Sequence, residues 1–271
     1  MWIVITCIAV LLFLSAMYLW CIRGRAGHKG WAGLENWNYA HRGLHDDEKP
    51  ENSMAAFRAA LEAGCGVELD VHLMRDGNLA VIHDSSLKRT AGADVRIEDL
   101  VTEDLANHHL ASTQECIPQF KDVLDLFDGK APLIVELKVE KNNYASLCQA
   151  VCHMLDQYNG AYCIESFDPR AVAWLRKNRP DIIRGQLSEN WMKTKAKMPW
   201  IVKFLLTYHI TSVWTHPDFI AYKYCDRKTF GTGLCRKLWK VHGVSWTLKT
   251  WEEYDIAVQD GWIPIFENFR L

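Results

Sequence analysis

The sequence predicts a closed parallel (β/α)8 barrel, the TIM-barrel fold, preceded by one transmembrane helix. Apolar segments of strand length alternate with amphipathic segments of helix length along most of the chain. Eight predicted strands fit into about 235 residues without a second linker, which is typical of such a barrel. An open, doubly wound parallel sheet is the alternative arrangement for the same alternation.

The amino-terminal segment is long and apolar enough to cross a membrane. No charged residue occurs between Trp2 and Ile22, and a helix of that length spans about 31 Å at about 1.5 Å per residue. A cleaved signal peptide, cut near Gly24-Arg25-Ala26, is the alternative, but it would have basic residues before a shorter apolar core. We therefore predict a membrane anchor over residues 1–22, a glycine-rich linker over 23–36 and a catalytic barrel over 37–271.

Charge and cysteine content indicate where the barrel lies. Arg23, Arg25 and Lys29 follow the span closely, so the positive-inside rule predicts a single-pass protein of the cell membrane with its barrel in the cytoplasm. The nine cysteines contain no CxxC pair, a pattern typical of reduced thiols.

The net charge of -2 gives no basic excess that would favour nucleic-acid binding. The oligomeric state does not follow from these features.

Each element is assigned from its pattern and its end signals. Asn52 or Ser53 can cap the first barrel helix, Gly64 can end it, and Pro169 suits the first turn of a later helix. The predicted strands lie near residues 37–41, 66–72, 132–138, 161–165, 182–186, 211–215, 241–246 and 262–266. The predicted helices lie near residues 53–63, 119–127, 143–158, 169–178, 218–224 and 250–260, with irregular helical pieces between 189 and 209.

Acidic residues occur within strands that are otherwise apolar. Glu68 and Asp70 are two residues apart, so both side chains point to the same face of the second strand, and Glu136 with Lys138 repeats this spacing. Three carboxylates that converge at the mouth of a barrel need a cation to remain ionised together. Carboxylate oxygens suit one Mg²⁺ or Ca²⁺ ion. The alternative is that these acids form ion pairs with Lys138 and Arg42.

Two histidines are expected beside these carboxylates. If Asp76-Gly77 forms a two-residue turn, the register places Asp70 opposite His83 and His72 opposite Val81. His41, at the end of the neighbouring strand, would reach the same place. A pair of histidines can take a proton from an attacking oxygen and give one to a leaving oxygen, while Arg42 and the metal offset phosphate charge. This set predicts phosphodiester cleavage.

The order of these motifs resembles that of the glycerophosphodiester phosphodiesterase family. The motifs are His41-Arg42-Gly43, Pro50-Glu51-Asn52-Ser53, Glu68-Leu69-Asp70-Val71, Asp76-Gly77, His83-Asp84, Ile117-Pro118, Glu136-Leu137-Lys138, Ser166-Phe167-Asp168 and Ser245-Trp246-Thr247. The resemblance covers roughly residues 37–267 and suggests a membrane-anchored member of bacterial type. It implies a TIM barrel, a divalent cation held by Glu68, Asp70 and Glu136, and acid/base roles for His41 and His83. The implied products are sn-glycerol 3-phosphate and an alcohol.

The chain departs from the family pattern near its end. The family usually has Thr-Asp followed by Pro where this chain has Ile265-Phe266-Glu267-Asn268-Phe269, a difference that bears on substrate choice.

Further residues are expected around the site. Lys138, Phe167 and Trp246 are candidates for substrate binding, although packing within the barrel also explains the two aromatic residues. Glu51, Asn52 and His72 are candidates for residues that support the ligands and the catalytic groups.

Two other functions are compatible with these sequence features. A lysophospholipase D acting on lysolipids is one, because an apolar wall and a membrane anchor would suit a lipid substrate. A non-catalytic membrane-bound binding protein is the other, although such a protein would be expected to lose a histidine or a ligand carboxylate, and none is missing here.

Overall fold

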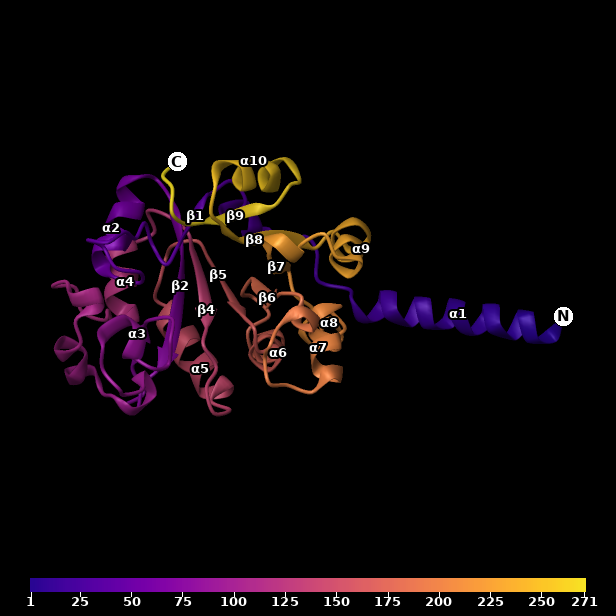
Figure 1. The fold of residues 1–271 in the computed structure, drawn as a ribbon, viewed down its shortest axis with the longest axis horizontal. Helices are drawn as coiled ribbons and strands as arrows, with labels where there is room; N and C mark the ends of the chain where they lie inside the picture. Colours follow the sequence, from indigo (N-terminus) through magenta and orange to yellow (C-terminus); the bar gives the residue numbers. More distant parts are fainter.

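The computed structural model describes residues 1–271 and confirms the closed barrel (Figure 1). Eight parallel strands pair in the circular order β1-β2-β4-β5-β6-β7-β8-β9, and β9 closes onto β1. A ninth strand, β3, pairs antiparallel with β2 outside this circle. The strands are β1 Tyr39–His41, β2 Gly66–Leu73, β3 Leu79–Val81, β4 Leu133–Leu137, β5 Tyr162–Ser166, β6 Arg184–Ser188, β7 Phe219–Lys223, β8 His242–Leu248 and β9 Ile263–Phe266.

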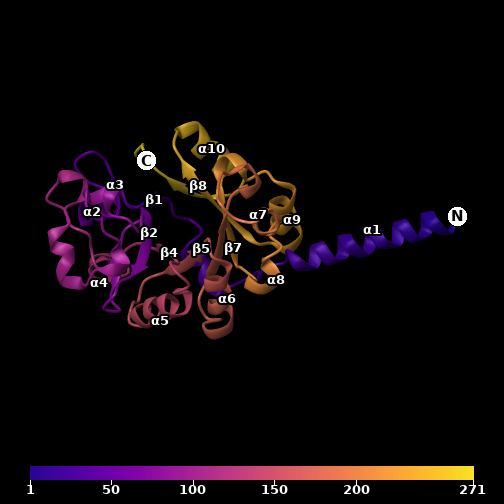
Figure 2. The ribbon, with the colours of Figure 1, turned by 60° about the horizontal axis from the view of Figure 1, so that its bottom comes forward.

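Helices surround the barrel, as expected for alternating β and α segments (Figures 1 and 2). Ser53 caps the first of them through its hydroxyl, which accepts a hydrogen bond from the Ala56 amide, and Pro169 opens α6. The α-helices are α1 Trp2–Cys21, α2 Met54–Glu62, α3 Lys88–Ala91, α4 Phe120–Phe127, α5 Tyr144–Leu155, α6 Pro169–Asn178, α7 Trp200–Thr207, α8 Ser212–Thr215, α9 Phe230–Trp239 and α10 Trp251–Gln259. Six short 3-10 helices are η1 Lys29–Gly33, η2 Ile97–Asp99, η3 Thr102–Asn107, η4 Leu110–Ser112, η5 Trp191–Lys193 and η6 Tyr224–Asp226.

The inside of the barrel changes from apolar to acidic along the strands. Ile134 and Cys163 belong to a buried apolar cluster that fills the amino-terminal half of the barrel. Two residues later on the same strands, Glu136 and Glu165 are also buried. Because side chains two residues apart share a face of a strand, each acid lies above an apolar residue, towards the carboxyl-terminal mouth. Active sites of this fold lie at that end.

The segment predicted as a linker makes contacts of its own. Trp31 is buried, and its ring stacks on His242 at the start of β8 with the ring centroids 4.0 Å apart. Arg25 pairs with the buried carboxylate of Asp218 at 2.6 Å, just before β7. Residues 23–36 therefore cover the amino-terminal end of the barrel, opposite the mouth.

Helix α1 extends away from the barrel along most of its length (Figures 1 and 2). None of its residues is buried, and its 20 residues are long and apolar enough to cross a membrane. A signal sequence near the amino terminus can meet the same criteria of length and apolar composition.

Two of the predicted elements are wrong, one strand and one helix. Within the predicted strand 211–215, residues Ser212–Thr215 form helix α8. Strand β7 occupies Phe219–Lys223, within the range 218–224 that was predicted as a helix. The β-branched residues near Thr211 favoured a strand, but Trp214 is exposed, and a barrel strand is covered on both faces. The uninterrupted run Phe219-Ile220-Ala221-Tyr222 is fully buried and is the better strand pattern. Helix α9 was not predicted.

The predicted hairpin register is wrong by one residue. β2 and β3 pair with His72 opposite Ala80, not Val81. The tight turn of the hairpin has three residues instead of the two expected. Gly77 has a φ of 86°, and its amide donates a hydrogen bond to the carbonyl of Met74 at 3.1 Å. A three-residue loop with glycine in the left-handed region is a common alternative to the two-residue turn.

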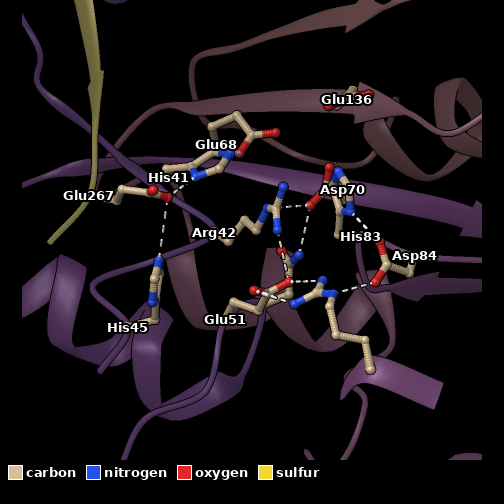
Figure 3. Close-up of polar contacts among 12 residues, drawn as sticks. His41, Arg42, His45, Glu51, Glu68, Asp70, His83, Asp84, Glu136 and Glu267 are labelled. Atoms are coloured by element: carbon tan, nitrogen blue, oxygen red, sulfur yellow. Dashed lines mark hydrogen bonds and ion pairs between the residues drawn. The ribbon is translucent and has the colours of Figure 1, made fainter. Parts of the chain in front are cut away.

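This shift changes the pairing of one catalytic candidate without removing it from the site. The carbonyl of Asp70 accepts a hydrogen bond from Ile82, so His83 is not opposite Asp70 as predicted. His83 instead follows β3 in a loop, and its side chain lies beside that of Asp70 (Figure 3).

Candidate active site

Three buried carboxylates meet at the mouth of the barrel. One oxygen from each of Glu68, Asp70 and Glu136 lies within 4.8 Å of the others. Glu68 and Asp70 share a face of β2, and the pairing of β2 with β4 places Asp70 beside Glu136. The sequence predicted this convergence from the spacing of the acids on their strands.

Two cations contact the same carboxylates. Lys138 Nζ lies 2.9 Å from Asp70 and 2.7 Å from Glu136, and Arg42 Nε lies 3.2 Å from Asp70. The ion pairs that were considered as an alternative to a metal site are therefore present. Burial raises the pKa of Asp70, but Lys138 and Arg42 outweigh burial and hold it well below its usual range.

The cations leave part of the acidic charge uncompensated. Burial, together with the charges of Asp70 and Glu136, raises the pKa of Glu68 well above its usual value. Burial also raises the pKa of Glu136 to about 7, despite Lys138. The Oε2 atom of Glu68 is buried without a hydrogen-bond partner. These shifts are expected of carboxylates gathered in a low-dielectric site with too few positive charges.

A fourth acid, Glu165 on β5, belongs to the same cluster. It is 1% exposed, and neither of its carboxylate oxygens has a hydrogen-bond partner. Burial, then the nearby Glu136, raises its pKa well above the usual value. Four carboxyl groups thus face the two fixed cations Arg42 and Lys138, so the donor set and its charge fit one divalent cation with oxygen ligands.

His41 lies at the end of β1 with its two ring nitrogens in different surroundings (Figure 3). Nδ1 is 2.6 Å from Oε2 of Glu267, and Nε2 is 3.8 Å from Oε2 of Glu68. Burial lowers the pKa of His41, and the hydrogen bond to Glu267 opposes that effect. The carboxylate behind Nδ1 therefore orients the ring so that Nε2 points into the acidic cluster.

His83 has the same kind of support. Its Nδ1 lies 2.6 Å from the carboxylate of Asp84, and burial lowers its pKa below the usual value. His72 supports the loop from behind, because its Nε2 contacts the His83 carbonyl at 3.1 Å and its Nδ1 contacts Glu98 at 2.7 Å.

The loop after β1 is held in an unusual backbone conformation. Arg42 and Asn52 both have a φ of 56°, in the left-handed region. A Cβ at Gly43 would lie 2.8 Å from the backbone of Ala56, so only glycine fits there without movement. Asn52 donates to Asp70 at 2.8 Å, and Glu51 accepts from Arg42 at 2.8 Å. The structure thus brings Glu51 and Asn52, two of the three predicted supporting residues, into contact with Arg42 and Asp70.

Aromatic side chains form one wall of the cavity between the histidines. The rings of Phe167 and Trp246 meet edge to face with centroids 5.6 Å apart, and Phe167 makes the same contact with Trp191. The cavity has a water-accessible volume of about 40 Å³. It is lined by His41, Arg42, Glu68, His83, Glu136, Glu165, Phe167, Leu187, Trp246 and Ile265.

The sequence analysis did not identify three acidic residues that lie in or beside the site. Glu165 shows the signal that found Glu68 and Glu136, an acid inside an apolar strand, and could have been identified in that way. Asp84 belongs to the His83-Asp84 motif, but no feature of the sequence marks it as the partner of the His83 ring. Glu267 stands in the segment that departs from the family pattern, and no local feature connects it to His41.

Comparisons with known proteins point to one family. The model of the glycerophosphoryl diester phosphodiesterase family matches residues 41–266. A glycerophosphodiester phosphodiesterase of Bacillus altitudinis is 32% identical over 155 residues, which cover 53% of this chain and 63% of that protein. Glycerophosphodiester phosphodiesterase 1 of the mouse is 27% identical over 247 residues, covering 79% of this chain and 72% of that protein. The match to the bacterial relative therefore spans less than two thirds of its length.

Solved structures show the same fold. A phosphodiesterase of Oleispira antarctica, in complex with the product sn-glycerol-3-phosphate, superposes with a TM-score of 0.73 at 19% identity and covers 91% of this chain and 96% of the other. A glycerophosphodiester phosphodiesterase of Thermotoga maritima gives a TM-score of 0.65 at 24% identity, covering 84% and 92%. Since the family model matches most of the barrel, the chain belongs to the glycerophosphoryl diester phosphodiesterase family.

Proposed function

We propose that this chain hydrolyses glycerophosphodiesters to sn-glycerol 3-phosphate and an alcohol with the help of one divalent cation. The observation that carries the proposal is the pair of histidines, each with a carboxylate on Nδ1, on either side of a buried acidic cluster. The names of the family and of its relatives support the same reaction class. The product bound to the Oleispira antarctica phosphodiesterase is consistent with a small phosphodiester as substrate.

Glu68, Asp70 and Glu136 would hold the cation, and Glu165 lies close enough to add to its charge environment. Mg²⁺ and Ca²⁺ both suit these oxygen donors. When bound, the ion would offset negative charge on the phosphate in the transition state. Arg42 and Lys138, both beside Asp70, would add fixed positive charge to bind and orient the phosphate.

His41 and His83 would serve as the general acid and the general base. One would deprotonate the attacking hydroxyl and the other would protonate the leaving alcohol. No serine or cysteine lines the cavity, so a protein nucleophile is not evident. The 2-hydroxyl of the glycerol group is held close to phosphorus by the substrate itself and gains the advantage of intramolecular attack. A 1,2-cyclic phosphate would then be opened by water, with the two histidines in exchanged roles.

A lysophospholipase D activity on lysolipids is the second candidate. The observation that favours it is the aromatic wall that Phe167 and Trp246 form in the cavity, with Trp191 packed behind Phe167. This wall could accommodate the acyl chain of a lysolipid. The presence of the apolar helix α1 also suits a substrate that lies in a membrane.

The proposed location is the cell membrane, with residues 1–22 as a single-pass anchor, residues 23–36 as the connection and residues 37–271 as a cytoplasmic catalytic domain. Arg23, Arg25 and Lys29 after the span support this orientation. All nine cysteines are free thiols in the structure, as is usual in a reducing compartment.

A substrate panel tests the activity. The purified full chain is assayed with glycerophosphodiesters and with lysolipids, in Mg²⁺ and in Ca²⁺, and with a glycerophosphodiester analogue that lacks the 2-hydroxyl. We expect release of sn-glycerol 3-phosphate from the glycerophosphodiesters. We expect the deoxy analogue to bind with similar affinity and to react far more slowly. Comparable turnover of the deoxy analogue would indicate direct attack by water, and no turnover of any substrate with either ion would reject the proposed reaction.

A further inference from the structure

Helix α1 leaves the barrel beside α7 and α9. The Tyr18 hydroxyl donates to the carbonyl of Tyr208, just after α7, at 3.2 Å. The Trp239 indole at the end of α9 donates to the carbonyl of Leu19 at 3.0 Å. Both ribbon views place α7, α8 and α9 around the base of α1 (Figures 1 and 2). If α1 crosses a bilayer, this side of the barrel must face the bilayer surface.

Large apolar side chains are exposed on that side. Trp200 is 68% exposed and Ile201 is 45% exposed at the start of α7, and Phe230 is 73% exposed at the start of α9. The end of α7 and the start of α9 both lie beside the base of α1. Phe230 precedes Gly231, where a Cβ would lie 2.7 Å from the Tyr18 hydroxyl. Phe204 on α7 is 37% exposed, and its ring lies 4.8 Å from that of Tyr208. Exposed tryptophan and phenylalanine are typical of surfaces that enter the lipid headgroup region.

The same region has an excess of positive charge. Residues 191–240 contain ten Lys or Arg residues and two Asp residues, whereas the whole chain has a net charge of -2. Four of these lysines are exposed and form no ion pair, and these are Lys195, Lys197, Lys237 and Lys240. Lys195 and Lys197 precede α7, Lys237 lies in α9, and Lys240 follows α9. Positive charge beside exposed apolar residues is complementary to a surface of anionic lipids.

We propose that the side of the barrel formed by α7 and α9, the α7/α9 surface, lies on an anionic lipid leaflet next to the point where α1 enters it. The proposal rests on α1 being a membrane anchor. Its occupant is a lipid surface, because the apolar residues and lysines surround the end of an apolar helix.

Docking would also bring the cavity close to the lipid. The segment that leads from β6 to α7 contains Trp191, and Trp191 contacts Phe167 on the wall of the cavity. The α7/α9 surface is thus connected to the substrate site by one short stretch of chain.

Hydrogen exchange of the full chain in lipid nanodiscs tests this surface. The chain is incorporated into nanodiscs of phosphatidylcholine alone and of phosphatidylcholine with phosphatidylglycerol, and is compared with the chain in nonionic detergent. We expect peptides from α7 and α9 to exchange at least about tenfold more slowly in the anionic nanodiscs than in detergent. Peptides from α5 should exchange equally in all three.

Paired variants separate the surface from the anchor. Trp200→Glu with Ile201→Glu should remove the protection of α7 and leave hydrolysis of a soluble glycerophosphodiester unchanged. Ile256→Glu on α10, at a residue of similar exposure, is the matched control and should keep the protection. If the chain enters nanodiscs but α7 and α9 do not exchange more slowly, the docking proposal is wrong. Equal protection of α7 and α9 in the lipid-free chain at high concentration would also overturn it, because it would indicate self-association. Failure of the chain to remain with the lipid would instead contradict the anchor.

Discussion

The carboxylate of Glu267 lies 2.6 Å from Nδ1 of His41, although the two residues are 226 positions apart in the chain. Closure of the barrel causes this contact, because β9 pairs with β1 and both strands end at the mouth. Glu267 also contacts Lys249 at 2.8 Å. Asp84 makes the same contact with Nδ1 of His83. In both candidate acid/base residues, a carboxylate therefore fixes which ring nitrogen carries the proton.

Glu267 should therefore act as a positioning residue. Glu267→Gln keeps the size of the side chain and removes its charge, and we expect kcat to fall roughly 10- to 100-fold, because the imidazole loses the partner that fixes its tautomer. KM and the melting temperature should change little. Glu252→Gln, at an exposed acid on α10, is the control. A normal kcat in Glu267→Gln would show that the contact is structural only.

The two histidines should each be required for turnover. His41→Ala and His83→Ala are each expected to reduce kcat about 10²- to 10⁴-fold, the usual effect of removing a positioned proton-transfer group. The double variant should lose less than the product of the two single losses, because groups that act together are not additive. His153→Ala, at an exposed histidine on α5, should behave as wild type. Near-normal turnover by either single variant would remove that residue from the mechanism.

Metal removal should abolish activity and metal addition should stabilise the fold. Excess chelator is expected to stop hydrolysis, and added Mg²⁺ or Ca²⁺ should raise the melting temperature, because an ion that binds only the folded state stabilises it. Glu68→Gln should lose this thermal response while remaining folded. Glu62→Gln, at an exposed acid on α2, should retain it. Full activity in chelator would contradict the metal site.

Stability should fall at mildly acidic pH because of His209. This residue is buried with Nε2 2.8 Å from the Thr232 hydroxyl, and burial lowers its pKa to about 4. The unfolded chain therefore binds a proton on this residue before the folded chain does. The free energy of unfolding should decrease as the pH falls from about 6.5 to about 4, on the order of 3 kcal/mol in total.

The variant His209→Asn tests this assignment in thermal unfolding of the full chain in detergent. Its φ of 59° suits asparagine, and the variant should show a shallower loss of stability over that pH range. His153→Asn should keep the wild-type slope. Identical slopes for wild type and His209→Asn would assign the acid sensitivity to other groups.

Orientation in the membrane can be measured with an exposed native thiol. Cys225 is exposed on the barrel, so a membrane-impermeant maleimide should label it only after intact cells are broken. Cys225→Ser identifies its share of the signal. Labelling of Cys225 in intact cells would place the barrel outside and contradict the positive-inside assignment.

The sequence by itself determined the barrel class, seven of its strands and the acidic cluster, because each depends on short-range periodicity. Acids at every second residue of a strand share a face wherever that strand lies, so Glu68, Asp70 and Glu136 could be grouped without coordinates. Tertiary structure decided what depends on segments far apart in the chain. Burial chose Phe219–Lys223 over residues 211–215 as the strand, and one left-handed glycine, Gly77, set the hairpin register. The partner of His41 was decided in the same way, because only the closed barrel brings Glu267 to it.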